Sequence, residues 1–360
     1  MCRRLGGGME IIMSLLFVGT YTESNAPAII EGQELGKGIY IYQYDEELGV
    51  VKDKVLCIEM TNPSWISVYD GRIFAVSESE DAAILQEYEM IQRNEETALN
   101  LINKLVMKGS ASCHIEINEK RKRLFLSDYG SGDLKVIDIS KKDDLRVIQE
   151  LHFIGKSIRA DRQETSHIHS SNLYQERLFA ADLGKDRIYV FDTSGEYLKK
   201  KEELVSTAGA GPRHMAVLEN RFNDQMLYVV NELNLSLSVY RNGKEIQTLS
   251  LLEREDLKDK ALAADICKSE DGYLYVSIRG SGEIRTFQVK DTGELEQLQV
   301  LELSEKGLRS ICLDNSQKHL LVADQTSGMI QSFLRKEDGT LRKGIPLVHV
   351  PAAVKVLIAR

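Results

Sequence analysis

The chain has 360 residues, of which 42% are hydrophobic and 28% charged, and this balance excludes both a disordered chain and a membrane-embedded one. Its formal net charge of −9 disfavours nucleic acid as a partner, because no basic stripe interleaved with aromatic residues offsets that charge. The five cysteines are odd in number and lack Cys-x-x-Cys spacing, which favours a reducing cytoplasm over a disulfide framework or a structural zinc site.

The start of the chain does not share the pattern of the rest. Residues 1–12 contain two arginines and an apolar run, but Glu10 interrupts the run, which disfavours a signal peptide. We interpret this segment as a disordered leader or a misassigned start, with Met9 or Met13 as the alternative start, and expect a single domain over residues 13–360. No stretch reaches the roughly 18 consecutive apolar residues of a membrane span, so no membrane partner is expected.

A short apolar strand motif then recurs seven times along the chain. Its central residues are Phe17, Phe74, Phe125, Phe179, Tyr228, Tyr275 and Leu321. Successive copies are separated by 57, 51, 54, 49, 47 and 46 residues. A period near 50 is too long for ankyrin or leucine-rich repeats and is typical of the four-stranded blade of a β-propeller.

A second strand with alternating apolar and polar residues follows each copy, as in residues 38–45, 133–139 and 283–289. Glycine-containing turns separate the two strands, which is typical of β-hairpins. Two strands per repeat exclude a helical solenoid. Only residues 254–264 have the composition for a short helix or an irregular excursion.

The end of the chain is predicted to close the ring. Residues 353–358 form an apolar strand without a partner nearby in the sequence, and we expect them to complete the blade that residues 15–21 begin. Such closure removes the free sheet edges. We therefore predict an all-β, seven-bladed propeller whose N- and C-terminal segments share one blade.

Polar residues occupy equivalent positions just before and just after the repeated strand in successive repeats. The innermost strands of a propeller line its channel, so residues at the same phase converge there. The residues before the strand are His114, His167, His169, Arg213, His214, Asp265 and Arg309, and those after it are Tyr21, Glu78, Asp128, Asp182, Glu232, Arg279 and Asp324. We interpret Asp128, Asp182 and Asp324 as structural partners of buried polar groups. The histidines, arginines and Glu232 place too much charge in one concavity for packing alone, which indicates a functional site.

At these positions the sequence resembles the propeller-type lactonase family, which includes a cycloisomerase-type 6-phosphogluconolactonase and the eukaryotic carboxymuconate lactonising enzyme. The matching strings follow the family order from about residue 13 onward and include Gly19-Thr20-Tyr21, His167-Ile168-His169, Gly211-Pro212-Arg213-His214, Asn231-Glu232-Leu233 and Tyr275-Val276-Ser277. The resemblance implies a catalytic cluster of Glu232, Arg213, Arg279 and a histidine, His169 or His167. Three positions depart from the family, which has Pro at Ser166, Glu at Asp265 and Asn at Ile278.

The activity that the resemblance implies is hydrolysis of a sugar-acid lactone, above all 6-phosphogluconolactone of the pentose phosphate pathway. This reaction needs an activated water and a partner for the charge that develops on the carbonyl oxygen. Glu232 or a neutral histidine of the His167/His169 pair is the expected base, with Arg213 as the oxyanion partner. The residues expected to bind the anionic lactone are Arg279, His214, Arg309, His114, Asp265 and Tyr21.

Two other functions remain open at this stage. A cycloisomerase that makes a lactone from an unsaturated acid would use the same base and arginines. A non-catalytic propeller would bind a protein or a small ligand, although the single tryptophan, Trp65, falls at an apolar strand position typical of a core residue. No cofactor and no metal are expected, because no Cys or carboxylate motif completes a zinc site around His167 and His169. The sequence does not indicate an oligomeric state.

Overall fold

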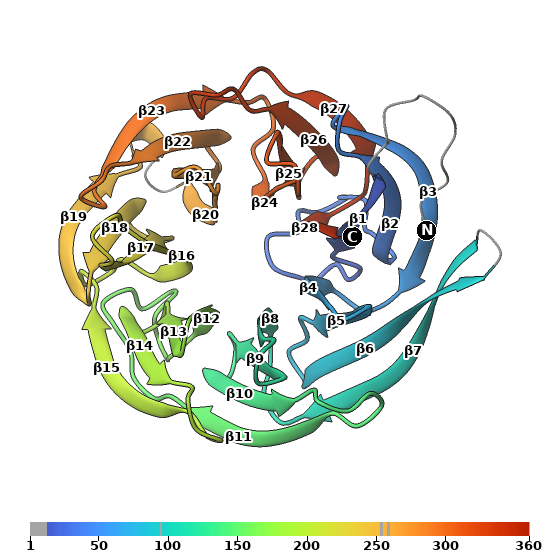
Figure 1. Ribbon diagram of the computed structural model, residues 1–360, viewed down its shortest axis with the longest axis horizontal. Helices are drawn as coiled ribbons and strands as arrows, with labels where there is room; N and C mark the ends of the chain where they lie inside the picture. The colour runs from blue at the N-terminus through green and yellow to red at the C-terminus, as the bar shows by residue number, and fades with distance from the viewer. Residues whose placement is uncertain (1–12, 94–95, 253–254, 258–259, 360) are drawn as a thin grey trace.

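Seven four-stranded antiparallel sheets are arranged in a ring around a common centre (Figure 1). The computed structural model describes residues 13–93, 96–252, 255–257 and 260–359, so the predicted leader, residues 1–12, lies outside the described residues. Six sheets contain four consecutive strands, whereas the seventh has the order β28-β1-β2-β3 and joins the two ends of the chain. This arrangement confirms the predicted all-β, seven-bladed propeller.

Each blade contributes one strand to each of four concentric layers. The innermost strands are β4 (Pro63–Tyr69), β8 (Ser112–Asn118), β12 (Ile168–Tyr174), β16 (Pro212–Glu219), β20 (Leu262–Lys268), β24 (Leu308–Leu313) and β28 (Ala353–Ala359). The second strands are β1 (Met13–Thr20), β5 (Arg72–Ser77), β9 (Arg123–Asp128), β13 (Arg177–Asp182), β17 (Gln225–Asn231), β21 (Tyr273–Arg279) and β25 (His319–Asp324). The third strands are β2 (Gly38–Asp45), β6 (Ala83–Arg93), β10 (Asp133–Asp138), β14 (Arg187–Asp192), β18 (Ser236–Arg241), β22 (Glu283–Val289) and β26 (Met329–Leu334). The outermost strands are β3 (Val50–Glu59), β7 (Glu96–Met107), β11 (Arg146–His152), β15 (Lys199–Val205), β19 (Lys244–Ser250), β23 (Leu295–Glu302) and β27 (Ile345–His349).

The repeated apolar motif is the second strand of every blade. These strands are buried on both faces, as β5 and β25 show along their whole length. Each blade packs face to face against two neighbours, so its middle strands are covered on both sides and apolar residues occupy consecutive positions. The core accordingly consists of clusters between adjacent blades, which leaves the channel to the polar residues of the innermost strands.

The ring is closed by antiparallel pairing of β28 with β1. Leu15 pairs with Ala359 and Val18 with Val356, and β1 pairs in turn with β2. The predicted closure is thereby confirmed. The segment expected to hold a short helix or an excursion contains one 3₁₀ turn, Glu255–Leu257. Within the described ranges no helix has the length and apolarity to cross a membrane.

A β-bulge interrupts the pairing of the innermost strand in every blade, always near the start of that strand. The ladder skips Ser64, Cys113, His169, Arg213, Ala264 with Asp265, Arg309 and Val354. A bulge leaves its extra residue outside the ladder and turns that side chain in a new direction. The seven bulges lie at the same phase of the repeat, so the skipped residues form a ring around the channel.

Candidate active site

The ring of bulge residues lies between two cavities in the channel. The larger, of about 510 Å³, receives side chains from all seven blades, among them Glu78, Cys113, His169, Arg213, Glu232, Arg279 and Arg309. The smaller, of about 20 Å³, shares Glu78, Cys113, His169, Arg213 and Arg309 with the larger one and adds Asp265 and His214. It has room for a single water molecule. The two cavities are therefore adjoining levels of one polar channel.

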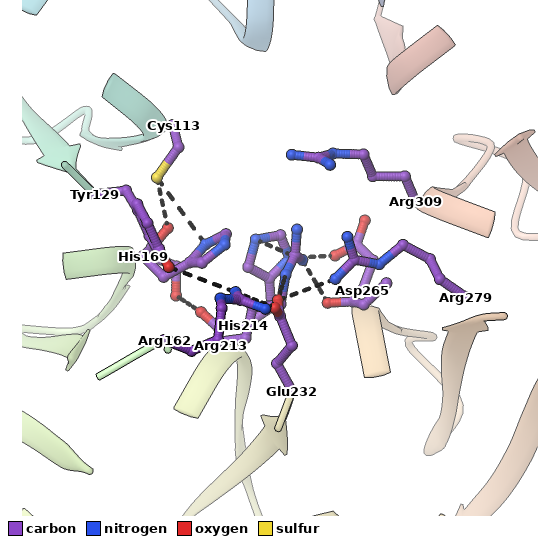
Figure 2. A network of polar contacts seen from close by, with 12 residues as sticks. Cys113, Tyr129, Arg162, His169, Arg213, His214, Glu232, Asp265, Arg279 and Arg309 are labelled. Atoms are coloured by element: carbon purple, nitrogen blue, oxygen red, sulfur yellow. Dashed lines mark hydrogen bonds and ion pairs between the residues drawn. The ribbon is translucent and has the colours of Figure 1, made fainter. Parts of the chain in front are cut away.

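Glu232 is the centre of the charge cluster in the larger cavity, and three arginines surround it (Figure 2). Its Oε1 lies 2.6 Å from Nη2 of Arg162, and its Oε2 lies 2.8 Å from Nε of Arg213 and 3.0 Å from Nη2 of Arg279. Burial by itself raises the pKa of Glu232, but Arg279, Arg213 and Arg162 outweigh it and lower the pKa to about 2. Glu232 is thus a permanent anion that holds the three guanidinium groups together.

Arg279 keeps hydrogen-bond donors available in this cluster. Its Nε and Nη2 are buried without an accepting partner, because the approach of Nη2 to Glu232 lacks hydrogen-bond geometry. Burial lowers the pKa of Arg279 to about 9 despite the attraction of Glu232, so the side chain remains charged at neutral pH. Buried donors of this kind normally find an acceptor. A carbonyl or carboxylate oxygen of a ligand would supply one.

The two histidines of the His-x-His string have different surroundings. The ring of His167 stacks on Tyr129 at a centroid distance of 4.3 Å, and its Nδ1 donates to the Tyr129 carbonyl (2.8 Å). His169 is the bulge residue of β12 and lines both cavities. Burial, reinforced by Arg213, lowers the pKa of His169 well below its usual range. The ring of His169 is therefore neutral at neutral pH.

His214 and Asp265 form a chain of polar contacts with Arg213 at the smaller cavity (Figure 2). Nδ1 of His214 lies 2.7 Å from Oδ1 of Asp265, and Nε2 lies 3.2 Å from Nη1 of Arg213. Burial and then Arg213 lower the pKa of His214 to about 4 although Asp265 opposes them, so the ring is neutral. A neutral ring that donates from Nδ1 to Asp265 accepts from Arg213 at Nε2. Both residues were predicted to bind substrate, yet neither lines the larger cavity.

Stability is expected to depend on pH through His214. Its pKa is about 4 in the folded state and about 6.5 in the unfolded state, so between these values the unfolded chain binds more protons. The free energy of unfolding should therefore fall as the pH drops from about 6.5 to about 4. Urea unfolding at several pH values should show a shallower fall for His214→Gln than for the exposed control His349→Gln. An equal fall in both variants would contradict this role of His214.

Tyr21 and Arg309 form a second polar group, in blades three and two steps around the ring from that of Glu232. The Tyr21 hydroxyl donates to Oε2 of Glu78 (2.7 Å) and accepts from Nη2 of Arg309 (2.6 Å). Arg309 lines both cavities, whereas Tyr21 is fully buried behind the wall. Of these two residues predicted to bind substrate, Arg309 alone is placed to touch it, and Tyr21 holds Arg309 and Glu78.

His114 lies behind the smaller cavity, where its ring contacts Trp65 and His214, which both line that cavity. Its ring packs on Trp65 at a centroid distance of 4.1 Å and lines neither cavity. Trp65 is only half-buried, and the Lys355 ammonium lies 3.5 Å from its ring centroid. The tryptophan expected in the core is thus a channel residue on β4 that packs only partly against the blade core. His114, which was predicted to bind substrate, packs against Trp65 instead and lines neither cavity.

The sequence interpretation missed Arg162. This residue lies between β11 and β12, in the longest of the connections that lead from one blade to the next. Nη2 of Arg162 donates to Glu232 Oε1 (2.6 Å) and approaches the Tyr129 hydroxyl at 3.4 Å. A search based on repeat phase cannot find a residue that lies outside the repeat, and no motif marks it. Glu78 was recognised as part of the ring but was not selected as a site residue.

Across the part of the chain that the structure describes, no group of three or more His, Cys, Asp or Glu side chains is placed to hold a metal ion. The cationic groups that line the cavity are arginines instead. Their planar guanidinium groups match the oxygen atoms of a carboxylate or phosphate.

The fold and the site together define a closed seven-bladed propeller with arginines, a carboxylate and a neutral histidine gathered at one end of its channel. The chain belongs to the family described as "Lactonase, 7-bladed beta-propeller", whose model matches residues 15–358. The resemblance noted from the sequence strings is thereby confirmed over nearly the whole chain.

Named relatives are similar along almost their full length. A 6-phosphogluconolactonase from Formosa agariphila is 30% identical over 349 residues, which cover 91% of this chain and 94% of the relative. A 6-phosphogluconolactonase from Bacillus subtilis is 25% identical over 357 residues, which cover 95% of this chain and 97% of the relative. The solved structure of a periplasmic gluconolactonase from Pseudomonas aeruginosa has a TM-score of 0.84 at 22% identity, with coverage of 97% and 99%, and shares the fold.

Proposed function

We propose that the protein hydrolyses a sugar-acid lactone and that 6-phosphogluconolactone is the first substrate to test. The observation that carries the proposal is the convergence of Arg213, Arg279 and neutral His169 on one cavity. Relatives named 6-phosphogluconolactonase support this choice of substrate. The ligand would be a small anionic lactone, in keeping with the arginines of the cavity wall.

In the proposed reaction a water molecule attacks the lactone carbonyl carbon while Nε2 of His169 takes a proton from that water. The negative charge that develops on the carbonyl oxygen is stabilised by Arg213 and Arg279. Collapse of the tetrahedral intermediate breaks the bond between the carbonyl carbon and the ring oxygen. The leaving ring oxygen takes the proton from His169, so the product is the open-chain hydroxy acid and the histidine returns to its neutral form.

We assign the base role to His169 and not to Glu232. Both carboxylate oxygens of Glu232 already pair with guanidinium groups, so neither is free to take a proton from a water molecule. The role of Glu232 in the proposal is to fix the directions of the arginines before the substrate arrives. Donors held in place in this way cost no reorganisation during the reaction.

The first test is the hydrolysis of freshly generated 6-phosphogluconolactone, followed at slightly acidic pH against the spontaneous rate, with δ-gluconolactone beside it. Acceleration well above the spontaneous rate is expected for at least one of the two lactones, and their ratio tests the preference for a phosphate. If neither lactone is opened faster than in buffer, hydrolysis of sugar-acid lactones is ruled out. The lactone-forming reaction on an unsaturated acid would then be tested next.

The proposal places this reaction in the cytoplasm. The four cysteines within the described residues are all free thiols, namely Cys57, Cys113, Cys267 and Cys312. Free thiols persist in a reducing compartment. Fractionation of the native cells with an antibody against the protein would locate it directly.

A further inference from the structure

Glu78 has a buried side chain in which one carboxylate oxygen accepts a hydrogen bond from the protein and the other does not. It follows β5 directly, lines both cavities and is only 9% exposed. Its Oε2 accepts the hydrogen bond of the Tyr21 hydroxyl (2.7 Å). Within the described part of the chain, Oε1 has no donor at hydrogen-bonding distance. Glu78 lines the cavity, so a ligand that offers a donor can form a hydrogen bond with this oxygen.

The surroundings of Glu78 hold the carboxylate in one orientation. Tyr21 occupies Oε2 from behind, and Nη2 of Arg309 lies 4.0 Å from the same oxygen while it donates to Tyr21. Nη1 of Arg309 is fixed in turn by Gln325 Oε1 (3.1 Å). Because these contacts all lie on the Oε2 side, Oε1 is presented to the cavity without further movement. Such preorganisation raises selectivity for a matching ligand.

The two sides of the cavity are complementary to different chemical groups of a ligand. On the side of Glu232, Nε and Nη2 of Arg279 donate no hydrogen bond and are available to an acceptor. On the side of Glu78, Oε1 can accept from a donor, and Glu23 and Glu80 are further carboxylates that line the cavity. A lactone that carries ring hydroxyl groups offers its carbonyl to the arginines and a hydroxyl to Glu78. An unsaturated dicarboxylic acid offers acceptors only and would meet repulsion at Glu78.

We infer that Glu78 is the hydroxyl-recognising group of the cavity and that it selects hydroxylated lactone rings over unsubstituted ones. This inference rests on the proposed function, since it specifies which lactones the same cavity accepts. A hydrogen bond between a hydroxyl and a charged carboxylate changes affinity by about 10- to 100-fold. We expect Glu78 to contribute a preference of that size.

The experiment measures binding with stable ring analogues, so that it does not depend on turnover. Calorimetric titration with δ-gluconolactam and with the unsubstituted δ-valerolactam should give a wild-type preference of at least about tenfold for the hydroxylated ring. Glu78→Leu should abolish this preference, and Glu78→Gln should reduce it. The same Glu-to-Gln change at exposed Glu59 is the control, and thermal unfolding shows that each variant is folded.

Three results would overturn the inference: no wild-type preference, the same preference in both Glu78 variants, or no binding of either lactam. Hydrolysis of the two lactones by the wild type is measured separately. If the preference depends on Glu78 but no lactone is hydrolysed, the proposed function fails and the recognition site stands. If lactones are hydrolysed but both Glu78 variants keep the preference, the recognition site fails and the proposed function stands.

Discussion

Replacement of His169 by glutamine is expected to lower kcat for lactone hydrolysis by about 10²- to 10⁴-fold, with a small change in KM. Glutamine keeps the polarity and approximate size of the side chain but cannot take a proton from the attacking water. Steady-state kinetics on the lactone that the wild type hydrolyses fastest would measure the effect. Near-normal kcat in this variant would transfer the base role to another group of the cavity.

The pH dependence supplies an independent check on His169. Burial, reinforced by Arg213, lowers its pKa well below the usual range, so the ring stays unprotonated when the medium is mildly acidic. The wild-type kcat/KM should therefore not fall as the pH drops from about 8 to about 6. A loss of activity that follows an ordinary histidine titration would contradict the assignment. The matched control is His349→Gln, an exposed histidine far along the chain, which should leave kcat unchanged.

Glu232→Gln is expected to reduce both activity and stability. Without the carboxylate, Arg162, Arg213 and Arg279 lose the anion that they share and repel one another. Removing one member of a buried ion pair costs roughly 3–5 kcal/mol of unfolding free energy. Displacement of the arginines should also lower kcat/KM by at least about 10²-fold, the size of effect seen when one oxyanion donor is lost.

Urea unfolding and steady-state kinetics on the same preparation would separate the two effects of Glu232→Gln. The control is Glu176→Gln, because Glu176 is an exposed carboxylate 3.5 Å from Nη2 of Arg121. An exposed pair of this kind contributes about 0–1 kcal/mol, so the control should match the wild type closely. Full stability in Glu232→Gln would mean that the three arginines do not depend on the carboxylate.

The bulges explain why motif strings far apart in the chain act together. His169 and Arg213 stand in different repeats, yet each is the residue that the pairing of its innermost strand skips. The same position holds Cys113 and Arg309 in two other blades. The same β-bulge, repeated in the innermost strand of each blade, thus directs chemically different side chains into the channel.

The sequence by itself determined the architecture of this protein. The apolar pattern repeats about every 50 residues, and each copy is set within the sequence of one blade. Every blade needs two apolar middle strands, whatever its position in the ring. Repeat phase also brought out the ring positions of His169, Arg213, Glu232 and Arg279. Ring closure was predicted from the apolar strand at the C-terminus, which has no partner nearby in the sequence. Pairing with the first blade satisfies the backbone hydrogen-bonding groups of both the strand and the sheet edge.

Only the tertiary structure decided what each polar residue does. The low pKa of Glu232 depends on arginines from three other places in the chain, and one of them, Arg162, lies outside the repeat. His214 and Asp265 share the phase of the site residues but form a chain of polar contacts with Arg213 at the smaller cavity. The physical reason is that electrostatic interactions and side-chain directions depend on neighbours across the channel, whereas the repeat records only the burial of each strand within its own blade.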